Sequence, residues 1–264
     1  MGIKPEDVRK HLEAKQGRAG APAAAAARAA PMEAGAAAVE PARESAILES
    51  ISASYFLLRR GLAVLAFAFP ILLWLGAGPD HVQASISAYY HFHAGGAPQP
   101  GAGTMRDVFV GVLWAVGAFL FFYKGYSSRE DWALNAAGIA ALLIALLPMD
   151  WPPNPAAQPT LTGIVHQTAA VLFFLSIAFV CLFCSGDTLE LVTDQTRRRR
   201  FKAVYTVLGT LMIVIPLTVV ALHFLMPGPA DRSPVVLLIE VGGIYVFSAF
   251  WLVKSREIAI IERP

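Results

Sequence analysis

The chain has 264 residues, of which 56% are hydrophobic and only 15% charged, and its mean hydropathy is +0.55. Soluble domains seldom reach this apolar content, so the composition predicts an integral membrane protein. The formal net charge of +2 is too small to indicate nucleic-acid binding, and the only cysteines, Cys181 and Cys184, lie in one apolar block, which excludes a disulfide framework.

The first 43 residues differ in composition from the rest of the chain. The stretch GRAGAPAAAAARAAPMEAGAAAVEPA is rich in Ala, Gly and Pro and holds few large apolar side chains. Because such a segment buries too little surface to offset its ordering entropy, the sequence predicts a disordered tail over residues 1–43. Over residues 44–56 apolar residues such as Ile47, Ile51 and Tyr55 recur at helical spacing, which predicts an amphipathic helix at the membrane interface.

Six apolar blocks follow over residues 57–255, and a short tail occupies residues 256–264. Each block is long enough, or nearly so, to cross about 30 Å of hydrocarbon at about 1.5 Å per residue. A lone segment in lipid must satisfy its own backbone hydrogen bonds, so the blocks are helices and not strands. The sequence thus predicts an all-α integral membrane protein, a six-transmembrane-helix bundle. The expected spans are residues 57–76, 107–124, 132–148, 163–184, 203–226 and 235–253.

The distribution of positive charge sets the expected orientation. Of the 21 Lys and Arg residues, only Arg106 and Arg232 fall on one side of such a bundle, and all the others fall on the opposite side. Because cytoplasmic loops carry the excess of Lys and Arg, both termini are expected in the cytoplasm. The run Arg197–Arg200 then faces the cytoplasm, where it attracts anionic lipid.

The stretch SISAYYHFHAGG, residues 85–96, lies between the first two spans, on the expected non-cytoplasmic side. Other polar residues of the spans fall at the same level. Ionisable groups inside a bilayer are costly and usually face a bundle interior or a watery cavity. We therefore expect a polar cup that opens outward, with the Ser85–His93 loop as its rim or lid. The candidate substrate-binding residues are Ser85, Ser87, Tyr89, Arg106, Asp107, Asp150, His166, His223 and Glu240.

Simpler roles stay open for several of these residues. Asp107 lies at the start of a helix, and its whole role can be to stabilise that helix N-terminus, whose partial positive charge favours an anion. His166 can hydrogen-bond a neighbouring helix and do nothing more. Glu240 is harder to explain, because a carboxyl group inside a span needs a partner or a proton. His223 is the expected partner, since the short connection Pro227–Pro234 makes the last two spans antiparallel neighbours.

Four stretches of the chain carry a resemblance to known proteins. They are SIS in the outward loop, RDVFVGVLWAVGAFLFFYKGYS, AGIAALLIALLP and VHQTAAVLFFLSIAFVCLF, within about residues 50–255. These stretches resemble an uncharacterised bacterial family of six-span membrane proteins, which is in turn similar to the Frag1/DRAM/Sfk1 group.

The resemblance implies a bacterial inner-membrane location and a role in lipid-anchor remodelling, membrane-lipid distribution or autophagy regulation, with membrane lipid as the partner. The shared polar positions correspond here to Ser85, Ser87, Arg106, Asp107 and His166. The insertion YYHFHAGGAPQPGAGT after SIS departs from the group, so the family's loop conformation does not carry over directly.

A second resemblance is to zinc-dependent membrane hydrolases of the ceramidase type, which combine a serine, an aspartate and three histidines near one membrane face. Ser87 would be the serine and zinc the cofactor, but the predicted helices hold no His-x-x-x-His pair. The residues available as metal ligands are His91, His93, Asp150, His166 and His223. A lipid-binding protein without a cofactor, a zinc-dependent lipid hydrolase, and a small-molecule transporter or sensor therefore all stay open, and so does a homo-oligomer.

Overall fold

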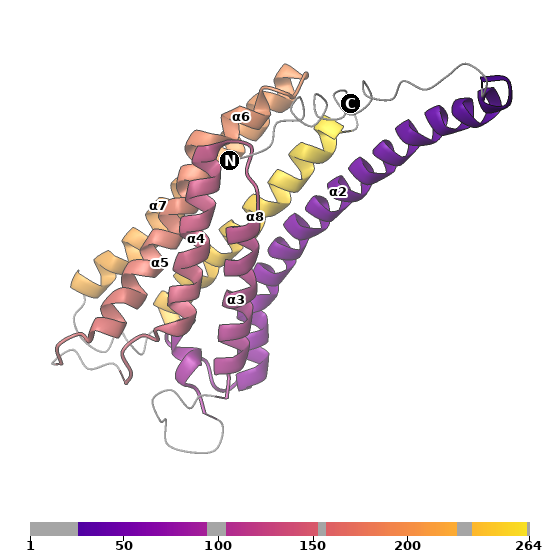
Figure 1. Cartoon of the computed structure of the whole chain (residues 1–264). Coiled ribbons are helices and arrows are strands. Elements are labelled where there is room, and N and C mark those ends of the chain that lie inside the picture. Colours follow the sequence, from indigo (N-terminus) through magenta and orange to yellow (C-terminus); the bar gives the residue numbers. More distant parts are fainter. Residues whose placement is uncertain (1–25, 94–103, 153–156, 226–233, 263–264) are drawn as a thin grey trace. The chain divides into compact units, whose positions relative to one another are not determined.

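The computed structural model describes residues 26–93, 104–152, 157–225 and 234–262, without the side chains of residues 26–42, 223, 224, 234 and 262. Within these ranges the regular structure is entirely helical, which confirms the all-α class (Figure 1). Helix α2 (Ala26–Ala77) is followed by the short 3-10 helix η1 (Ser87–His91), α3 (Arg106–Phe122) and α4 (Ser128–Leu146). Helix α5 (Leu161–Phe179) continues through the π-helix η2 (Val180–Cys184) into α6 (Ser185–Leu189), and α7 (Gln195–Leu225) and α8 (Pro234–Glu262) complete the order.

The chain divides into two compact units, residues Met1–Ser54 and Tyr55–Pro264. The described part of the first unit is the N-terminal portion of α2, in which Ser54 Oγ donates a hydrogen bond to the Ser50 carbonyl at 2.8 Å. Helix therefore covers residues 26–43, where the sequence analysis predicts disorder. Alanine fills much of this stretch and has the highest helix propensity of any residue, which explains the difference. Residues 1–25 of the predicted tail lie outside the described residues.

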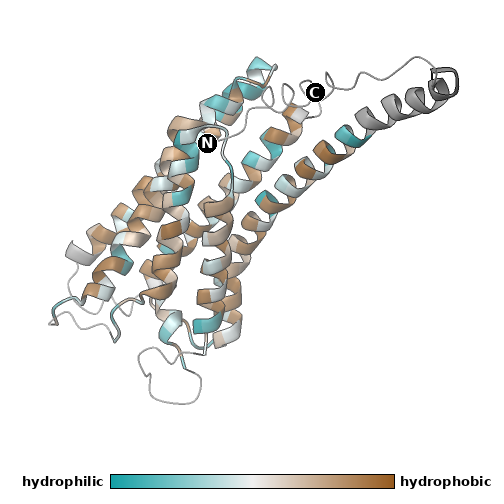
Figure 2. Cartoon of the chain, in the orientation of Figure 1, coloured by the Kyte–Doolittle hydropathy of each residue, from teal (hydrophilic) through white to brown (hydrophobic). Residues whose placement is uncertain are grey.

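Four helical stretches are long and apolar enough to cross a membrane, namely Arg43–Ala77, Leu161–Leu189, Gln195–Leu222 and Val235–Ile261. Hydrophobic residues dominate their middle parts, as Figure 2 shows by colour. The chain is thus a multi-pass membrane protein, as predicted, whereas the full number of six spans stays a prediction.

Helices α3 and α4 are weaker candidates for spans. Helix α3 has 17 residues. At about 1.5 Å per residue it falls short of about 30 Å of hydrocarbon. Helix α4 has 19 residues, but it begins with Arg129, Glu130 and Asp131 close together in its first turn. Its apolar part is therefore shorter than the helix itself.

The last two long helices extend beyond the predicted spans. Helix α7 begins at Gln195 and not near residue 203, so the run Arg197–Arg200 is helical. Helix α8 continues past the predicted end at residue 253 to Glu262. This extension places Lys254 and Glu257 among buried residues, with 3% and 0% of their surface exposed.

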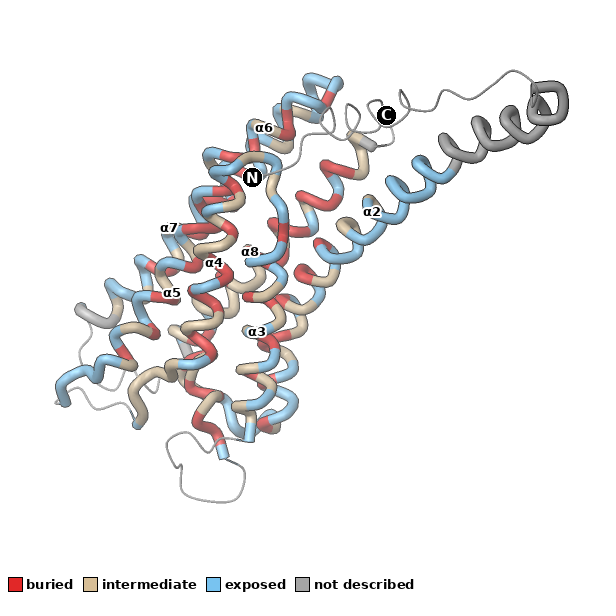
Figure 3. Tube along the Cα trace, viewed as in Figure 1, coloured by how far each residue is buried: buried red, intermediate tan, exposed pale blue. Residues whose placement is uncertain are grey.

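The second unit is a bundle in which α3 neighbours α4, α4 neighbours α5, α5 neighbours α7, and α7 neighbours α8. The faces of the helices that meet in the bundle are buried, and the opposite faces are exposed (Figure 3). Small residues bring α3 and α4 close together. A Cβ on Gly117 would lie 2.9 Å from the Gly138 carbonyl oxygen, and one on Gly138 would lie 2.7 Å from the Gly117 oxygen. Any larger residue at either position would force these helices apart.

The C-terminal part of α2, residues 55–77, belongs to this second unit and contacts two other helices. Ser248 Oγ of α8 donates a hydrogen bond to the Ala63 carbonyl at 2.8 Å. The rings of Phe69 and Phe109 of α3 pack with their centroids 5.7 Å apart. These contacts place the start of the following loop at one end of the bundle.

Candidate functional site

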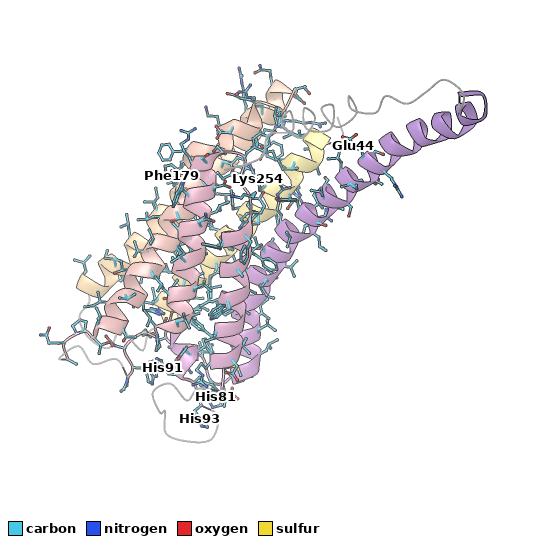
Figure 4. The ribbon with its side chains drawn as sticks, viewed as in Figure 1. Glu44, His81, His91, His93, Phe179 and Lys254 are labelled. Atoms are coloured by element: carbon cyan, nitrogen blue, oxygen red, sulfur yellow. The ribbon has the colours of Figure 1, made fainter. Side chains whose placement is uncertain are left out.

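Residues 85–91, here called the SIS loop, pack onto one end of the bundle. Figure 4 labels His91 at this end, together with His81 and His93. Five residues of the loop are buried: Ser85, Ile86, Ala88, Tyr89 and His91. The Tyr90 ring meets the Phe109 ring of α3 edge-on, with centroids 5.9 Å apart. The loop is therefore part of the packed structure and covers the end of the bundle.

Glu240 of α8 holds the SIS loop by two hydrogen bonds. One carboxylate oxygen accepts the Ile86 backbone N–H at 2.6 Å, and the other accepts the Ser85 hydroxyl at 3.2 Å. Ser85 Oγ in turn accepts the Ser87 backbone N–H at 3.0 Å. Both carboxylate oxygens of Glu240 are thus occupied by the loop, and they join it to α8.

His166 of α5 holds the same loop from another helix. Its Nδ1 lies 2.8 Å from the Leu147 carbonyl oxygen, and its Nε2 lies 3.0 Å from Ser87 Oγ. A carbonyl oxygen can only accept, so Nδ1 carries a proton, and in the neutral ring Nε2 is then the acceptor. Ser87 therefore donates its hydroxyl proton to a buried imidazole. This is the arrangement in which a histidine polarises a serine hydroxyl.

His91 ties the loop to the segment that follows α4. Its Nε2 lies 3.1 Å from the Met149 carbonyl oxygen, and its ring stacks on the Trp151 ring with centroids 5.5 Å apart. Burial lowers the pKa of His91, and the hydrogen bond to Met149 offsets only part of this effect. The neutral imidazole is therefore the form that fits this place best.

Asp150 hydrogen-bonds Thr160, which is the N-cap residue of α5. Its carboxylate accepts the Thr160 hydroxyl, and also the Thr160 backbone N–H at 3.1 Å. The Asp150 oxygens pack so tightly on Gly163 that a Cβ there would lie 2.2 Å from Oδ2. The simplest role of Asp150 is therefore to fix the connection between α4 and α5, which places His166 beside the loop.

The other predicted site residues lie at the edge of this arrangement. The Tyr89 hydroxyl accepts the Gln83 backbone N–H at 3.5 Å, and burial raises the pKa of that hydroxyl. Arg106 and Asp107 form an ion pair at 3.7 Å, but the Asp107 side chain is 91% exposed. His93 is exposed. The side chain of His223 lies outside the described residues, so its pairing with Glu240 stays a prediction.

The structure thus brings Ser85, Ser87, His166 and Glu240 together through one short loop. In the part of the chain that is described, no group of three or more His, Cys, Asp or Glu residues is arranged to hold a metal ion. The contact between Ile86 and Glu240 joins residues 154 positions apart and involves a backbone N–H. No sequence pattern signals such a contact, and for this reason the sequence analysis paired Glu240 with His223 alone.

A second polar cluster, which the sequence analysis missed, lies deep in the bundle at the opposite end. Lys254 of α8 donates to Thr188 Oγ1 of α6 at 2.7 Å and pairs with Glu257 at 3.5 Å. The Tyr205 hydroxyl of α7 also donates to Glu257. All four residues are buried, and Glu257 Oε1 has no hydrogen-bond partner within the described ranges. The sequence does contain a signal for this cluster. Lys254 and Glu257 have the i, i+3 spacing of neighbours on one helix face, just beyond the last apolar block.

The model of the family described as "Protein of unknown function (DUF998)" matches residues 61–255. The chain belongs to the DUF998 family. No curated protein and no solved structure matches it.

The matched DUF998 region contains the SIS loop, His166 and Glu240, and the whole first unit lies outside it. The predicted membership of an uncharacterised membrane-protein family is confirmed to this extent. The likeness to the Frag1/DRAM/Sfk1 group stays a prediction, as does the bacterial inner-membrane location.

Proposed function

We propose that this DUF998 protein crosses the membrane six times, has both termini in the cytoplasm, and binds the headgroup of a membrane lipid at the SIS-loop end of the bundle. The observation that carries the proposal is the pair of hydrogen bonds from Ser85 and Ile86 to Glu240. They make the loop a lid whose closed position depends on an intramembrane carboxylate.

The chemistry of Glu240 favours an amine-bearing headgroup. The carboxylate lies six residues into α8, or about 9 Å from the helix start. This is the depth at which a headgroup can reach it from the membrane surface. Both loop donors to Glu240 are neutral, a hydroxyl and a backbone N–H. An ammonium group offers charge-assisted hydrogen bonds, which are stronger than these neutral ones.

A ligand can replace the loop contacts of Glu240 only if the loop moves, because the donors Ser85 and Ile86 are buried in the closed loop. Ser87 and Glu240 are both partly exposed, so water can reach them when the lid moves. His166, by contrast, is 2% exposed and fixed by the Leu147 carbonyl, so it stays in place as the loop shifts. The headgroup of phosphatidylethanolamine, with an ammonium and hydrogen-bond acceptors, suits such a carboxylate, hydroxyl and imidazole.

The test is the thermal stability of the detergent-purified full chain with added phosphatidylethanolamine. A lipid that binds only the folded state raises Tm in a concentration-dependent way. We expect this rise in the wild type and its loss in Glu240→Gln, which keeps an acceptor for Ile86 N–H but removes the charge. Asp80→Asn, an equally conservative change at an exposed residue in the connection that leads to the SIS loop, is the matched control. Equal lipid responses in the wild type and Glu240→Gln would rule out the proposed site.

A lipid hydrolase is the second candidate, because Ser87 donates to the buried imidazole of His166. An activated serine nucleophile needs such a base within hydrogen-bond reach. Labelling of the purified protein by a fluorophosphonate probe, lost in Ser87→Ala but retained in Ser85→Ala, would favour this reading. Stoichiometric zinc in the same preparation would instead favour the metal-dependent form of hydrolysis.

A further inference from the structure

A groove of about 500 Å³ lies on the outside of the bundle between α4 and α5, far from the SIS loop. It is lined by Arg129, Trp132, Ala133, Leu172, Leu175, Ser176 and Phe179. Figure 4 labels Phe179 towards the end of the bundle that is opposite to His91. The groove therefore lies near the end where α4 begins and α5 ends, which the positive charges predict to be cytoplasmic.

The polarity of the groove changes along its length. Arg129, in the first turn of α4, places a 65% exposed guanidinium group at the mouth. Trp132, one turn further along α4, is 77% exposed, and tryptophan prefers the level of lipid headgroups. Beyond it, Leu172, Leu175 and Phe179 line the wall along about 10 Å of α5. The charged group of Arg129, the ring of Trp132 and the apolar wall of α5 therefore follow one another in the same order as the phosphate, the glycerol and the acyl chain of a phospholipid.

The charge at the mouth is available to a ligand. Arg129 pairs with Asp187 of α6, but the distance between Nη2 and Oδ1 is 3.7 Å, longer than a good charge-assisted hydrogen bond. A guanidinium group has five N–H donors, so one such contact leaves donors free for a phosphate. The basic run Arg197–Arg200 begins α7 close to the same end, and three of its four side chains are exposed. Basic residues of this kind concentrate anionic lipid at the membrane surface.

We infer that the groove between α4 and α5 binds one anionic phospholipid, with its phosphate on Arg129 and an acyl chain along Leu172, Leu175 and Phe179. This site is independent of the proposed headgroup site at the SIS loop. It lies on the opposite leaflet and selects negative charge, whereas Glu240 selects positive charge. One chain would then contact both leaflets through different lipid chemistries.

The test measures lipid affinity of the delipidated full chain in neutral detergent by native mass spectrometry, with phosphatidylglycerol and, for comparison, phosphatidylcholine. We expect one tight phosphatidylglycerol site in the wild type. Arg129→Gln should weaken it about tenfold, the loss expected for one charge-assisted contact. Arg199→Gln removes the same charge from an exposed position outside the groove and should change the affinity less than about twofold.

A second variant tests the apolar part of the groove. Leu172→Trp adds a large ring at a position that is already 44% exposed, so the fold is preserved while the groove is obstructed. It should weaken phosphatidylglycerol binding although no charge has changed. Equal losses in Arg129→Gln and Arg199→Gln would mean only diffuse attraction, and full affinity in Leu172→Trp would exclude the groove. A Leu172→Trp protein that changes from dimer to monomer would assign the groove to a second copy of the chain and overturn the inference.

Discussion

The buried pair of Lys254 and Glu257 offers the sharpest test of the packing of α6, α7 and α8. In Lys254→Met the Glu257 carboxylate keeps only the Tyr205 hydroxyl, and its Oε1 already has no partner in the described part of the chain. Removing one partner of a buried ion pair costs about 3–5 kcal/mol, because the remaining charge is stranded. Removing both charges together strands nothing, so the double variant Lys254→Met/Glu257→Leu should lose clearly less than the sum of the single losses.

The assay is a double-mutant cycle on the free energy of unfolding, measured by titrating the detergent-solubilised protein with sodium dodecyl sulfate. We expect a coupling energy of about 2 kcal/mol or more between Lys254 and Glu257. The control is the more exposed pair of Lys124 and Asp131, which lie 3.4 Å apart and whose coupling should stay within about 1 kcal/mol. Additivity within about 0.5 kcal/mol at Lys254 and Glu257 would refute the reasoning, since it would mean that the two charges do not depend on one another.

Three further predictions concern topology, the first unit and pH. Reporters that are active only in the cytoplasm should work when fused after Ser127, Thr193 or Pro264 and fail after Gly101, Asn154 or Gly228, and reversal at any two sites would contradict six spans. Deletion of residues 2–43 should leave a monodisperse gel-filtration peak in detergent, because the second unit has its own core; aggregation would show that this core needs the deleted segment. Burial lowers the pKa of His91 in the folded state. The stability contributed by the neutral His91 ring should therefore be complete above the unfolded pKa of about 6.5 and be lost as pH falls from there through the lower folded pKa. The Tm of the wild type should therefore decrease more steeply between about pH 7 and 5 than that of His91→Gln, and parallel curves would exclude this role.

The helices themselves could be predicted from the sequence, because long apolar runs leave few alternatives in a membrane. The predicted spans 107–124 and 132–148 differ from α3 and α4 by only a few residues. The large differences occur where helices leave the apolar region. Helix α8 carries Lys254 and Glu257 beyond residue 253, and hydropathy cannot detect a polar helical turn that neighbouring helices bury.

The candidate site was predictable in its composition but not in its connections. Clustering at one level of the bundle singled out Ser85, Ser87, His166 and Glu240, and the structure brings these four residues together. What the sequence could not supply is the role of backbone groups. The Ile86 N–H and the Leu147 carbonyl complete the contacts of Glu240 and His166, and every residue type carries such groups.

The two polar clusters differ in a way that separates function from stability. At the inner cluster every side chain is closed to solvent, so moving Lys254 or Glu257 would strand a charge in a medium that cannot hydrate it. At the SIS loop the donors to Glu240 are a hydroxyl and a backbone N–H, so no ion pair has to be broken when the loop moves away from the carboxylate. A site that exchanges partners must lie where the cost of exchange is small. This difference is the reason that the proposed ligand site is the SIS loop, whereas the inner cluster holds α6, α7 and α8 together.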